Sequence, residues 1–225
     1  YEIKKYDFNA MIAEIFDVKD LTTLHIDRKD LVCTDERPWP YSESDTKFHK
    51  TFYENLKTHE DIKKTYFDFV QSEVAHVMSE DTFLFQKFPT FRIALPNTKA
   101  VNTWHYDSDD DHGHPDWEIN FQIAVTDMLG NQATWVESIP GLGDYSPMEM
   151  RQGQFSIFYG NKCKHGNKRN DTPSTRVSLD FRVMPLSKYL LNLSKGSTGE
   201  SAIAERKFEP GGYYYVYKAG EGVLP

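Results

Sequence analysis

Apolar side chains recur at helical spacing in the first third of the chain. One stripe spans residues 8–16, with Asn9 as a capping residue near its start, and predicts a first amphipathic helix. A second stripe spans residues 44–78, which is long for one globular helix, so we expect a break between residues 58 and 61. The segment between the stripes, residues 30–45, contains prolines and many small polar residues and predicts a loop.

The pattern changes in the second half, where short apolar segments alternate with Gly, Pro, Asn and Asp. These segments are rich in β-branched and aromatic residues, which is typical of strands: FRIALP, EINFQIAVTD, QATWVES, GQFSIFYG, TRVSLDFRVMP and YYYVYK. Many short strands favour a jelly roll over a parallel α/β sheet. We therefore expect a mainly β protein with flanking helices, a cupin-like double-stranded β-helix (jelly roll) preceded by N-terminal helices packed on one sheet.

We expect one domain over residues 1–225, because two domains would leave each half with little core. Residues 1–80 are predicted to form its mainly helical N-terminal part, and residues 85–218 its jelly-roll core. The polar segment 194–201 predicts a loop.

Composition and charge narrow the class of protein. With 39% hydrophobic and 27% charged residues, the chain is globular rather than disordered. Its net charge of −8 argues against nucleic acid as a partner, because phosphates select basic surfaces. No apolar run approaches the roughly 18 residues of a membrane helix, and the first ten residues contain no apolar signal region. Two cysteines exclude a disulfide framework, so we expect a reduced, cytoplasmic setting.

Three residues suggest a metal site. His105 and Asp107 are two positions apart, so on an extended strand their side chains point to the same side. His165 follows the predicted strand at residues 153–160 and supplies a third ligand from a distant part of the roll. Two imidazoles and one carboxylate on one face of an ion leave three positions open, as in mononuclear iron(II) oxygenases, whereas zinc usually completes a tetrahedron.

Other interpretations of these residues stay open at this point. A single His-x-Asp pair is common by chance, and His112 and His114 compete as ligands from a neighbouring acidic loop. Cys163 lies two residues before His165 and would suit zinc, but no second such pair exists, and a small buried side chain is the simpler interpretation.

The strand after His165 begins with a basic residue, Arg176, eleven positions further on. A turn and a return strand of that length bring its guanidinium back beside the metal, where its planar fork would grip a carboxylate. Ser178 shares its face of the strand and would offer a hydroxyl to the same carboxylate. The structural alternative is an ion pair between Arg176 and Asp180. Arg182 is further along the same face, and we interpret it as a structural ion-pair residue.

Further pocket residues follow from alternation and position. Asn120 and Gln122 share the polar face of a predicted strand, Asn120 as a contact for a co-substrate and Gln122 for the substrate, the alternative being cross-strand hydrogen bonds. Trp104 and Trp135 are predicted as walls on the substrate side, with core packing as the alternative. Arg92 would reach the substrate or form a surface ion pair.

The run from residue 88 to 185 resembles the 2-oxoglutarate/iron(II) oxygenase superfamily in its phytanoyl-CoA-dioxygenase-like branch. It is more closely similar to the hydroxylase-type proteins encoded with streptomycin biosynthesis. The matching pieces occur in family order and are FRIALP, WHYDSD, GHPDWEINFQIAVTD, WVESIPGLGDY, GQFSIFYGNKCKHGN and TRVSLDFRVMP. The N-terminal helical part carries no motif that matches.

This resemblance implies Fe(II) as cofactor and 2-oxoglutarate as co-substrate. His105, Asp107 and His165 match the catalytic metal ligands, and Arg176 matches the arginine that binds the far carboxylate of 2-oxoglutarate. Asn167, two residues beyond the distal histidine, occupies a position near the co-substrate. The implied reaction consumes dioxygen and proceeds through an iron(IV)-oxo species. Because related halogenases replace the carboxylate with a small residue, Asp107 favours hydroxylation or desaturation.

The expected substrate is a small polar metabolite. The acidic segment 107–111 would attract a cationic one such as an amino-sugar, in agreement with the resemblance, although a run of charges is more often simply solvated. Two other functions remain open: a metal-containing β-roll that binds a small ligand without redox chemistry, and a metal-dependent isomerase or lyase. Neither needs a carboxylate clamp such as Arg176. The sequence does not indicate an oligomeric state.

Overall fold

The structure of the protein, a computed structural model, describes residues 1–32, 46–101, 103–109, 112–195 and 207–225. Most of the loop predicted at residues 30–45 and most of the one at 194–201 lie outside the described residues.

The first helix, α1 (Phe8–Phe16), confirms the first predicted stripe. Its cap is Asp7 rather than Asn9: the Asp7 carboxylate accepts a hydrogen bond from the backbone N–H of Ala10 at 2.9 Å, while the Asn9 amide donates to the carbonyl of Val125. A 3₁₀ turn (Leu21–Thr23), the short helix α2 (Leu24–Asp27) and a second 3₁₀ turn (Lys29–Leu31) follow.

The second stripe folds as two helices, α3 (Lys47–Leu56) and α4 (Glu60–Phe69), so the predicted break is confirmed. A π-helical turn (Val70–Val74) and the single turn α5 (Ala75–Val77) extend α4. The sequence pattern did not indicate the later helix α6 (Leu186–Ser194).

Ten strands form two antiparallel sheets among the described residues. The larger sheet has the order β10-β9-β1-β8-β3-β6, with β2 also paired to β8. Its strands are β1 (Thr82–Gln86), β2 (Thr90–Ala94), β3 (Ile119–Ala124), β6 (Phe155–Phe158), β8 (Arg176–Pro185), β9 (Tyr214–Lys218) and β10 (Gly222–Leu224). The smaller sheet has the order β5-β4-β7 and consists of β4 (Thr134–Val136), β5 (Ser146–Met148) and β7 (His165–Asn167).

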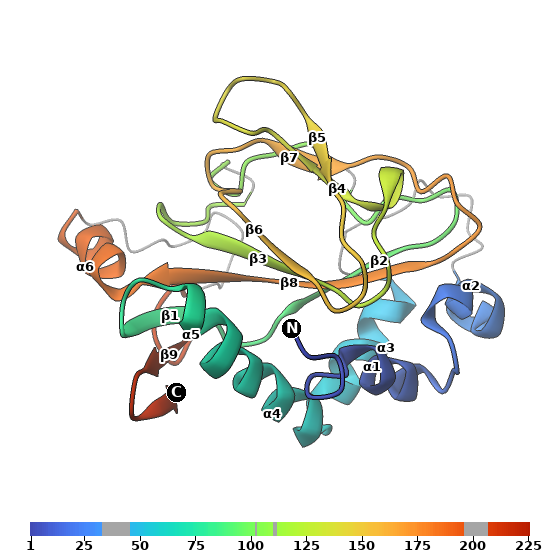
Figure 1. Cartoon of the computed structure of the whole chain (residues 1–225), viewed down its shortest axis with the longest axis horizontal. Helices are drawn as coiled ribbons and strands as arrows, with labels where there is room; N and C mark the ends of the chain where they lie inside the picture. The colour runs from blue at the N-terminus through green and yellow to red at the C-terminus, as the bar shows by residue number, and fades with distance from the viewer. Residues whose placement is uncertain (33–45, 102, 110–111, 196–206) are drawn as a thin grey trace.

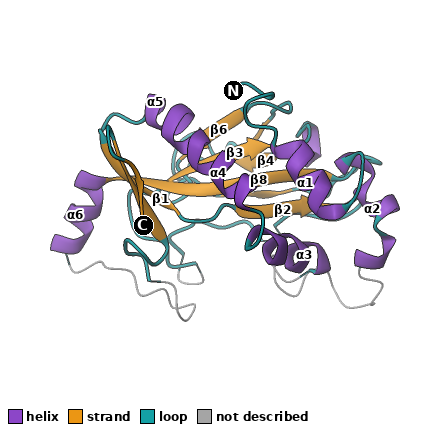
Figure 2. Cartoon of the chain, turned by 90° about the horizontal axis from the view of Figure 1, so that it is seen from below, coloured by secondary structure: helices purple, strands orange, loops and turns teal. Residues whose placement is uncertain are grey.

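The two sheets and the helices form layers. Figure 1 shows α1, α3 and α4 below the large sheet and the small sheet above it. Figure 2, seen from below, shows α1 and α4 in front of the large sheet and α3 beside β2. This arrangement confirms the predicted class, a mainly β jelly-roll-like protein with N-terminal helices packed on one sheet. Each of the six predicted segments contains a strand, whereas β1, β5, β7 and β10 were not predicted.

Strand β8 lies at the centre of the large sheet and is buried on both faces. Its alternate apolar residues belong to the core under the helices, where Phe181 lies edge-on to Tyr66 with ring centroids 5.2 Å apart. The residues between them are polar: Arg176, Ser178, Asp180 and Arg182. Because successive side chains on a strand point to opposite faces, these four lie on the face toward the small sheet. The fold therefore buries a row of charges between the two sheets.

None of the helices formed by the described residues is long and apolar enough to cross a membrane.

Candidate metal centre

The two histidines of the predicted metal site lie side by side. His105 forms an isolated antiparallel bridge with His165 at the start of β7, through two backbone hydrogen bonds of 3.0 Å. Asp107 lies in the turn that follows, where its N–H donates to the carbonyl of Gly160 at 3.0 Å. The expectation of an extended strand through both His105 and Asp107 is therefore wrong. Only His105 pairs in a β-bridge, and Asp107 already belongs to the turn. The three side chains nevertheless converge.

The ligand atoms are arranged around one point. Oδ1 of Asp107 lies 3.5 Å from Nε2 of His105 and 3.6 Å from Nε2 of His165, and one ligand atom from each of the three residues lies within 4.8 Å of the others. Asp107 is 1% exposed, His105 is 5% exposed and His165 is 6% exposed. This group is the one set of three or more potential ligands found among the described residues.

Hydrogen bonds fix which nitrogen each imidazole presents. Nδ1 of His105 lies 3.1 Å from the carbonyl of Thr103, and Nδ1 of His165 lies 3.1 Å from the carbonyl of Cys163. A carbonyl can only accept, so both Nδ1 atoms carry hydrogen, and both Nε2 atoms face Oδ1 of Asp107. Burial lowers the pKa of His165 to about 4, so this imidazole is neutral at pH 7. The orientation and the protonation state both suit metal ligation.

Asp107 is held as a carboxylate. Burial acts to raise its pKa, but the nearby positive charge of Arg182 is the largest of the causes that outweigh burial and hold the pKa well below its usual range. The donor set is thus two imidazoles and one carboxylate, which fits a divalent cation.

The competing ligands have other roles. Nδ1 of His114 lies 2.6 Å from the carboxylate of Glu118, which also accepts a hydrogen bond from the hydroxyl of Tyr214. The ring of His112 stacks on that of His105 with centroids 4.2 Å apart. Cys163 is a buried free thiol that contributes its backbone carbonyl to His165. None of these three belongs to the metal-ligand group.

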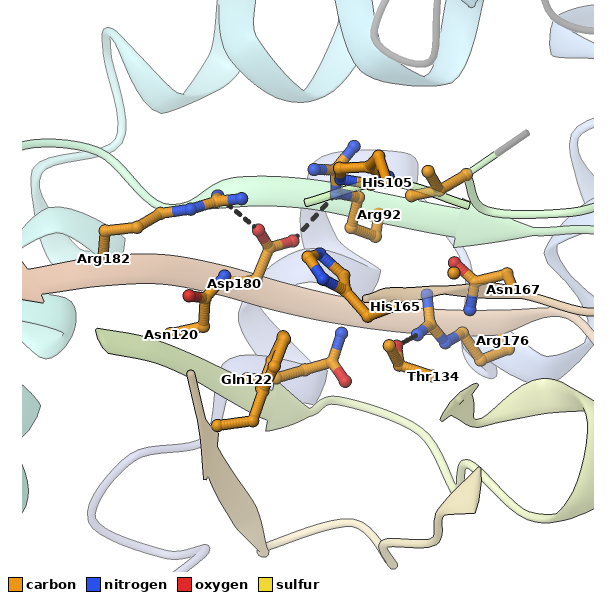
Figure 3. A pocket seen from close by; sticks show the side chains of 13 residues that line it. Arg92, His105, Asn120, Gln122, Thr134, His165, Asn167, Arg176, Asp180 and Arg182 are labelled. Carbon is orange, nitrogen blue, oxygen red and sulfur yellow. Dashed lines mark hydrogen bonds and ion pairs between the residues drawn. The ribbon is translucent and has the colours of Figure 1, made fainter. Parts of the chain in front are cut away.

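A small, partly open cavity of about 20 Å³ adjoins the two histidines. Figure 3 shows its side chains, which come from both sheets and from the bridge at His105. Of the predicted site residues, the following line it: His105, His165, Arg92, Asn120, Gln122, Asn167 and Arg176.

Arg176 lines this cavity beside Thr134 and Asn167 and is 1% exposed (Figure 3). One of its nitrogens, Nη2, donates to Oγ1 of Thr134 at the long distance of 3.4 Å. Nε and Nη1 have no hydrogen-bond partner within the described structure. The alternative interpretation of Arg176, an ion pair with Asp180, is not what the hydrogen bonds show, because the two Asp180 oxygens accept from Arg92 and Arg182. Burial lowers the pKa of Arg176 to about 9, as expected for a cation with too few partners.

The polar residues of the cavity divide into two groups. Both atoms of the Asn120 amide are used within the protein: Nδ2 donates to Oδ2 of Asp107 at 2.7 Å, and Oδ1 accepts from the N–H of Gly160 at 3.2 Å. Asn120 therefore holds the carboxylate of Asp107, a role that its prediction as a co-substrate contact did not include. Gln122 has a buried Oε1 that no described residue partners, and Asn167 makes one long bond to Ala133. These two amides face the cavity near Arg176 (Figure 3).

Ser178 is fully buried but does not line the cavity. Its cross-strand partners are Arg92 and Ala124, and its hydroxyl has no hydrogen-bond partner in the part of the chain that the structure describes. Its contact with a ligand stays a prediction.

The two tryptophans do not line this cavity, so their contact with a substrate stays a prediction. Trp104 packs edge-on against Tyr145 and covers Gly166, where an added Cβ would meet its ring at 2.9 Å. Trp135 alternates with Thr134 on β4, so its ring points to the other face of the small sheet, where Nζ of Lys168 lies 3.2 Å from the ring centroid.

Arg92 is a cavity residue rather than a surface one, and its Nε donates to Oδ1 of Asp180 at 2.9 Å. Arg182, as predicted, forms structural ion pairs: with Asp107 at 3.1 Å and with Asp180 at 2.8 Å.

Sequence reasoning missed Asp180 and Thr134 as cavity residues. The alternation that identified Ser178 also places Asp180 on that face, and Thr134 lies within the strand predicted at residues 132–138. Both signals were present, but neither showed that these side chains face the cavity. Asp110 and Asp111 of the acidic segment lie outside the described residues. The Asp109 carboxylate accepts a hydrogen bond from the backbone N–H of Tyr106 at 2.9 Å, which closes the turn behind Asp107.

Comparison with known proteins gives one clear relative. The streptomycin biosynthesis protein StrG from Streptomyces griseus is 31% identical over 189 residues, which cover 84% of this chain and 84% of that protein. No protein-family model matches the chain.

Solved structures resemble the chain more weakly. The non-heme α-ketoglutarate-dependent carbocyclase SnoK from nogalamycin biosynthesis is 14% identical, with 82% of this chain and 76% of that chain covered and a TM-score of 0.48. AviO1 from Streptomyces viridochromogenes Tue57 is 18% identical, with 83% and 87% covered and a TM-score of 0.44. These scores lie below 0.5, so the assignment of this chain rests on the Streptomyces griseus relative.

Proposed function

The chain belongs to the family of the streptomycin biosynthesis protein StrG, and from the site described above we propose that it is an Fe(II)- and 2-oxoglutarate-dependent oxygenase that hydroxylates a small polar metabolite. One observation carries this proposal: a buried arginine with two unpartnered nitrogens lies in the same cavity as a buried His-Asp-His group.

The residues present fit the metal and the co-substrate. His105, Asp107 and His165 would hold the metal through Nε2, Oδ1 and Nε2, and Arg176 would receive the far carboxylate of 2-oxoglutarate. A buried guanidinium without partners is unfavourable, and a carboxylate satisfies it with two charge-assisted hydrogen bonds. A β-roll that bound a neutral ligand, or an isomerase without a dicarboxylate, would have no use for this group.

When bound, iron(II) and 2-oxoglutarate supply the activation of dioxygen, with succinate and carbon dioxide as the by-products of substrate hydroxylation. The protein contributes side chains that bind and orient the co-substrate. Arg176 would set the position of the dicarboxylate, Gln122 and Asn167 would offer amides beside it, and the burial of His105, Asp107 and His165 limits the access of bulk water. Asp107, a full carboxylate ligand, supports hydroxylation as the outcome.

For the substrate we propose an amino-sugar or another intermediate of secondary metabolism, with dioxygen as the second small-molecule partner. The name of the Streptomyces griseus relative, a streptomycin biosynthesis protein, supports this class. The net charge of −8 is compatible with a cationic substrate.

The test begins without oxygen. Fe(II) and 2-oxoglutarate are added anaerobically, and we expect a weak visible charge-transfer band that is lost in Arg176→Ala and kept in Arg151→Ala, an exposed ion-pair arginine. Under air, a panel of aminoglycosides, amino-sugars and amino acids is then screened by succinate release. Absence of both the band and any succinate would refute the oxygenase. A metal-loaded protein that binds panel members without the band would instead favour the non-redox β-roll.

A further inference from the structure

The two oxygens of the Asp107 carboxylate have different surroundings. Oδ1 is the atom that faces Nε2 of both histidines. Oδ2 accepts three hydrogen bonds: from Nδ2 of Asn120 at 2.7 Å, from Nε of Arg182 at 3.2 Å and from Nη2 of Arg182 at 3.1 Å. Nη2 also reaches Oδ1, at 3.2 Å. The lone pairs of Oδ2 are therefore in use within the protein, whereas Oδ1 retains free directions toward the histidines.

The two donors are placed by the sheet itself. Asn120 on β3 and Arg182 on β8 are direct cross-strand partners, so their side chains emerge together on the face toward the small sheet. Asn120 is oriented by the N–H of Gly160, at 3.2 Å.

Arg182 is oriented by a chain of buried charges. Its Nη1 donates to Oδ2 of Asp180 at 2.8 Å, and Oδ1 of Asp180 accepts from Arg92 at 2.9 Å. The charges alternate along this chain, from Arg92 through Asp180 and Arg182 to Asp107, and every side chain in it is at most 14% exposed. Removing one side chain from this row of ion pairs would leave an uncompensated buried charge. The ion pairs therefore hold Arg182 in one orientation.

We propose that Asn120 and Arg182 are positioning residues that reserve Oδ2, which means that their hydrogen bonds occupy its lone pairs. Asp107 can then bind a metal through Oδ1 only. A carboxylate that bound through both oxygens would occupy one more coordination position and leave fewer for other ligands. The two residues thereby keep positions open for a chelating co-substrate and dioxygen, and in that last point the inference rests on the proposed function. The positive charge of Arg182 also offsets part of the negative charge of Asp107, which weakens the attraction of the apoprotein for a cation.

This role differs from a merely structural one in the direction of its effects. If the two residues only hold the fold, their loss weakens the binding of the metal and of the co-substrate together. If they reserve Oδ2, their loss leaves metal binding unchanged or tighter and weakens co-substrate binding.

The test uses Co(II), whose visible d–d spectrum reports coordination number. Asn120→Leu removes one donor and leaves the ion-pair chain intact, and Arg182→Lys keeps the charge but loses the fork. Arg28→Lys is the matched control, because Arg28 makes the same kind of forked contact to Asp30 at the surface, at 2.9 and 2.8 Å. Co(II) is titrated first and 2-oxoglutarate second, both followed by absorbance and calorimetry, with circular dichroism as a check of folding.

We expect Co(II) to bind both site variants as tightly as the wild type or more tightly, with an altered d–d spectrum. We expect 2-oxoglutarate to bind at least about tenfold more weakly, with Arg28→Lys unchanged. Parallel loss of both affinities, or no change in either, would overturn the proposal. If wild-type Co(II) protein binds no 2-oxoglutarate, the proposed function fails, and the d–d spectra decide the inference: identical spectra in wild type and variants overturn it, and altered spectra support it.

Discussion

The guanidinium of Arg176 is 1% exposed, and two of its nitrogens have no partner among the described residues. Replacing it with methionine removes the charge and keeps a long, flexible side chain of similar reach. The structure predicts opposite effects of this change on the stability of the ligand-free protein and on the binding of 2-oxoglutarate.

The stability effect follows from the unpartnered atoms. A buried polar group without a hydrogen bond costs about 1–3 kcal/mol, and a hydrophobic replacement of similar volume loses less than about 1.5 kcal/mol in packing. We therefore expect Arg176→Met to raise the free energy of unfolding of the apoprotein by about 1 kcal/mol. For a chain of this size, that corresponds to a rise in Tm of about 2–4 °C.

The binding effect has the other sign. Two charge-assisted hydrogen bonds to a carboxylate contribute about 1.5–3 kcal/mol each, so the variant should lose at least about 3 kcal/mol of co-substrate binding, on the order of 100-fold in Kd. In the wild type, Mn(II) with 2-oxoglutarate at about 100 times its Kd should add about 2.7 kcal/mol, or about 5–11 °C in Tm.

The assay is thermal unfolding followed by circular dichroism, with and without Mn(II) and 2-oxoglutarate. Arg151→Met serves as control, since this exposed arginine pairs with Asp127 outside the cavity, at 2.7 Å. An apoprotein destabilised by more than about 1 kcal/mol would show that Arg176 is satisfied in the fold, and a full ligand-induced shift in the variant would show that it is not the carboxylate anchor.

Two further changes probe the buried charges and the packing around the metal ligands. Burial raises the pKa of Asp180, but Arg92 and Arg182 outweigh it and leave the pKa below its usual value, so the stabilisation by Asp180 is complete above about pH 4 and is lost as the pH falls through the lowered pKa. Asp180→Asn should therefore cost about 3 kcal/mol in urea unfolding at pH 7 and progressively less below pH 4; a cost independent of pH would contradict this. Gly160→Ala places a Cβ 2.8 Å from Nδ2 of Asn120 and 2.9 Å from Cε1 of His165. It should weaken Co(II) binding by about tenfold in a spectrophotometric titration, and wild-type affinity would show that these side chains give way freely.

Comparison of the predicted and observed helices and strands shows which elements follow from the local sequence pattern alone. The helical stripe at residues 8–16 and the strand at 176–185 were predicted, because the periodicity of apolar residues depends only on backbone geometry. Helix α6 was not predicted, since three of its leucines are exposed and give no clear stripe. Strands β5 and β7 are three residues long, too short for a pattern of alternation to be recognised.

The sequence by itself determined the chemistry of the site: a His-x-Asp pair, a distal histidine and an arginine eleven residues later. It also determined that Arg176, Ser178, Asp180 and Arg182 share one face of a strand. It did not determine what that face meets. Only the tertiary structure decided that Arg176 faces the cavity with two nitrogens unpartnered among the described residues, while Arg182 binds Asp107, 75 residues away in the chain. Alternation is a property of one strand, whereas these partners arrive from another sheet and from a distant turn.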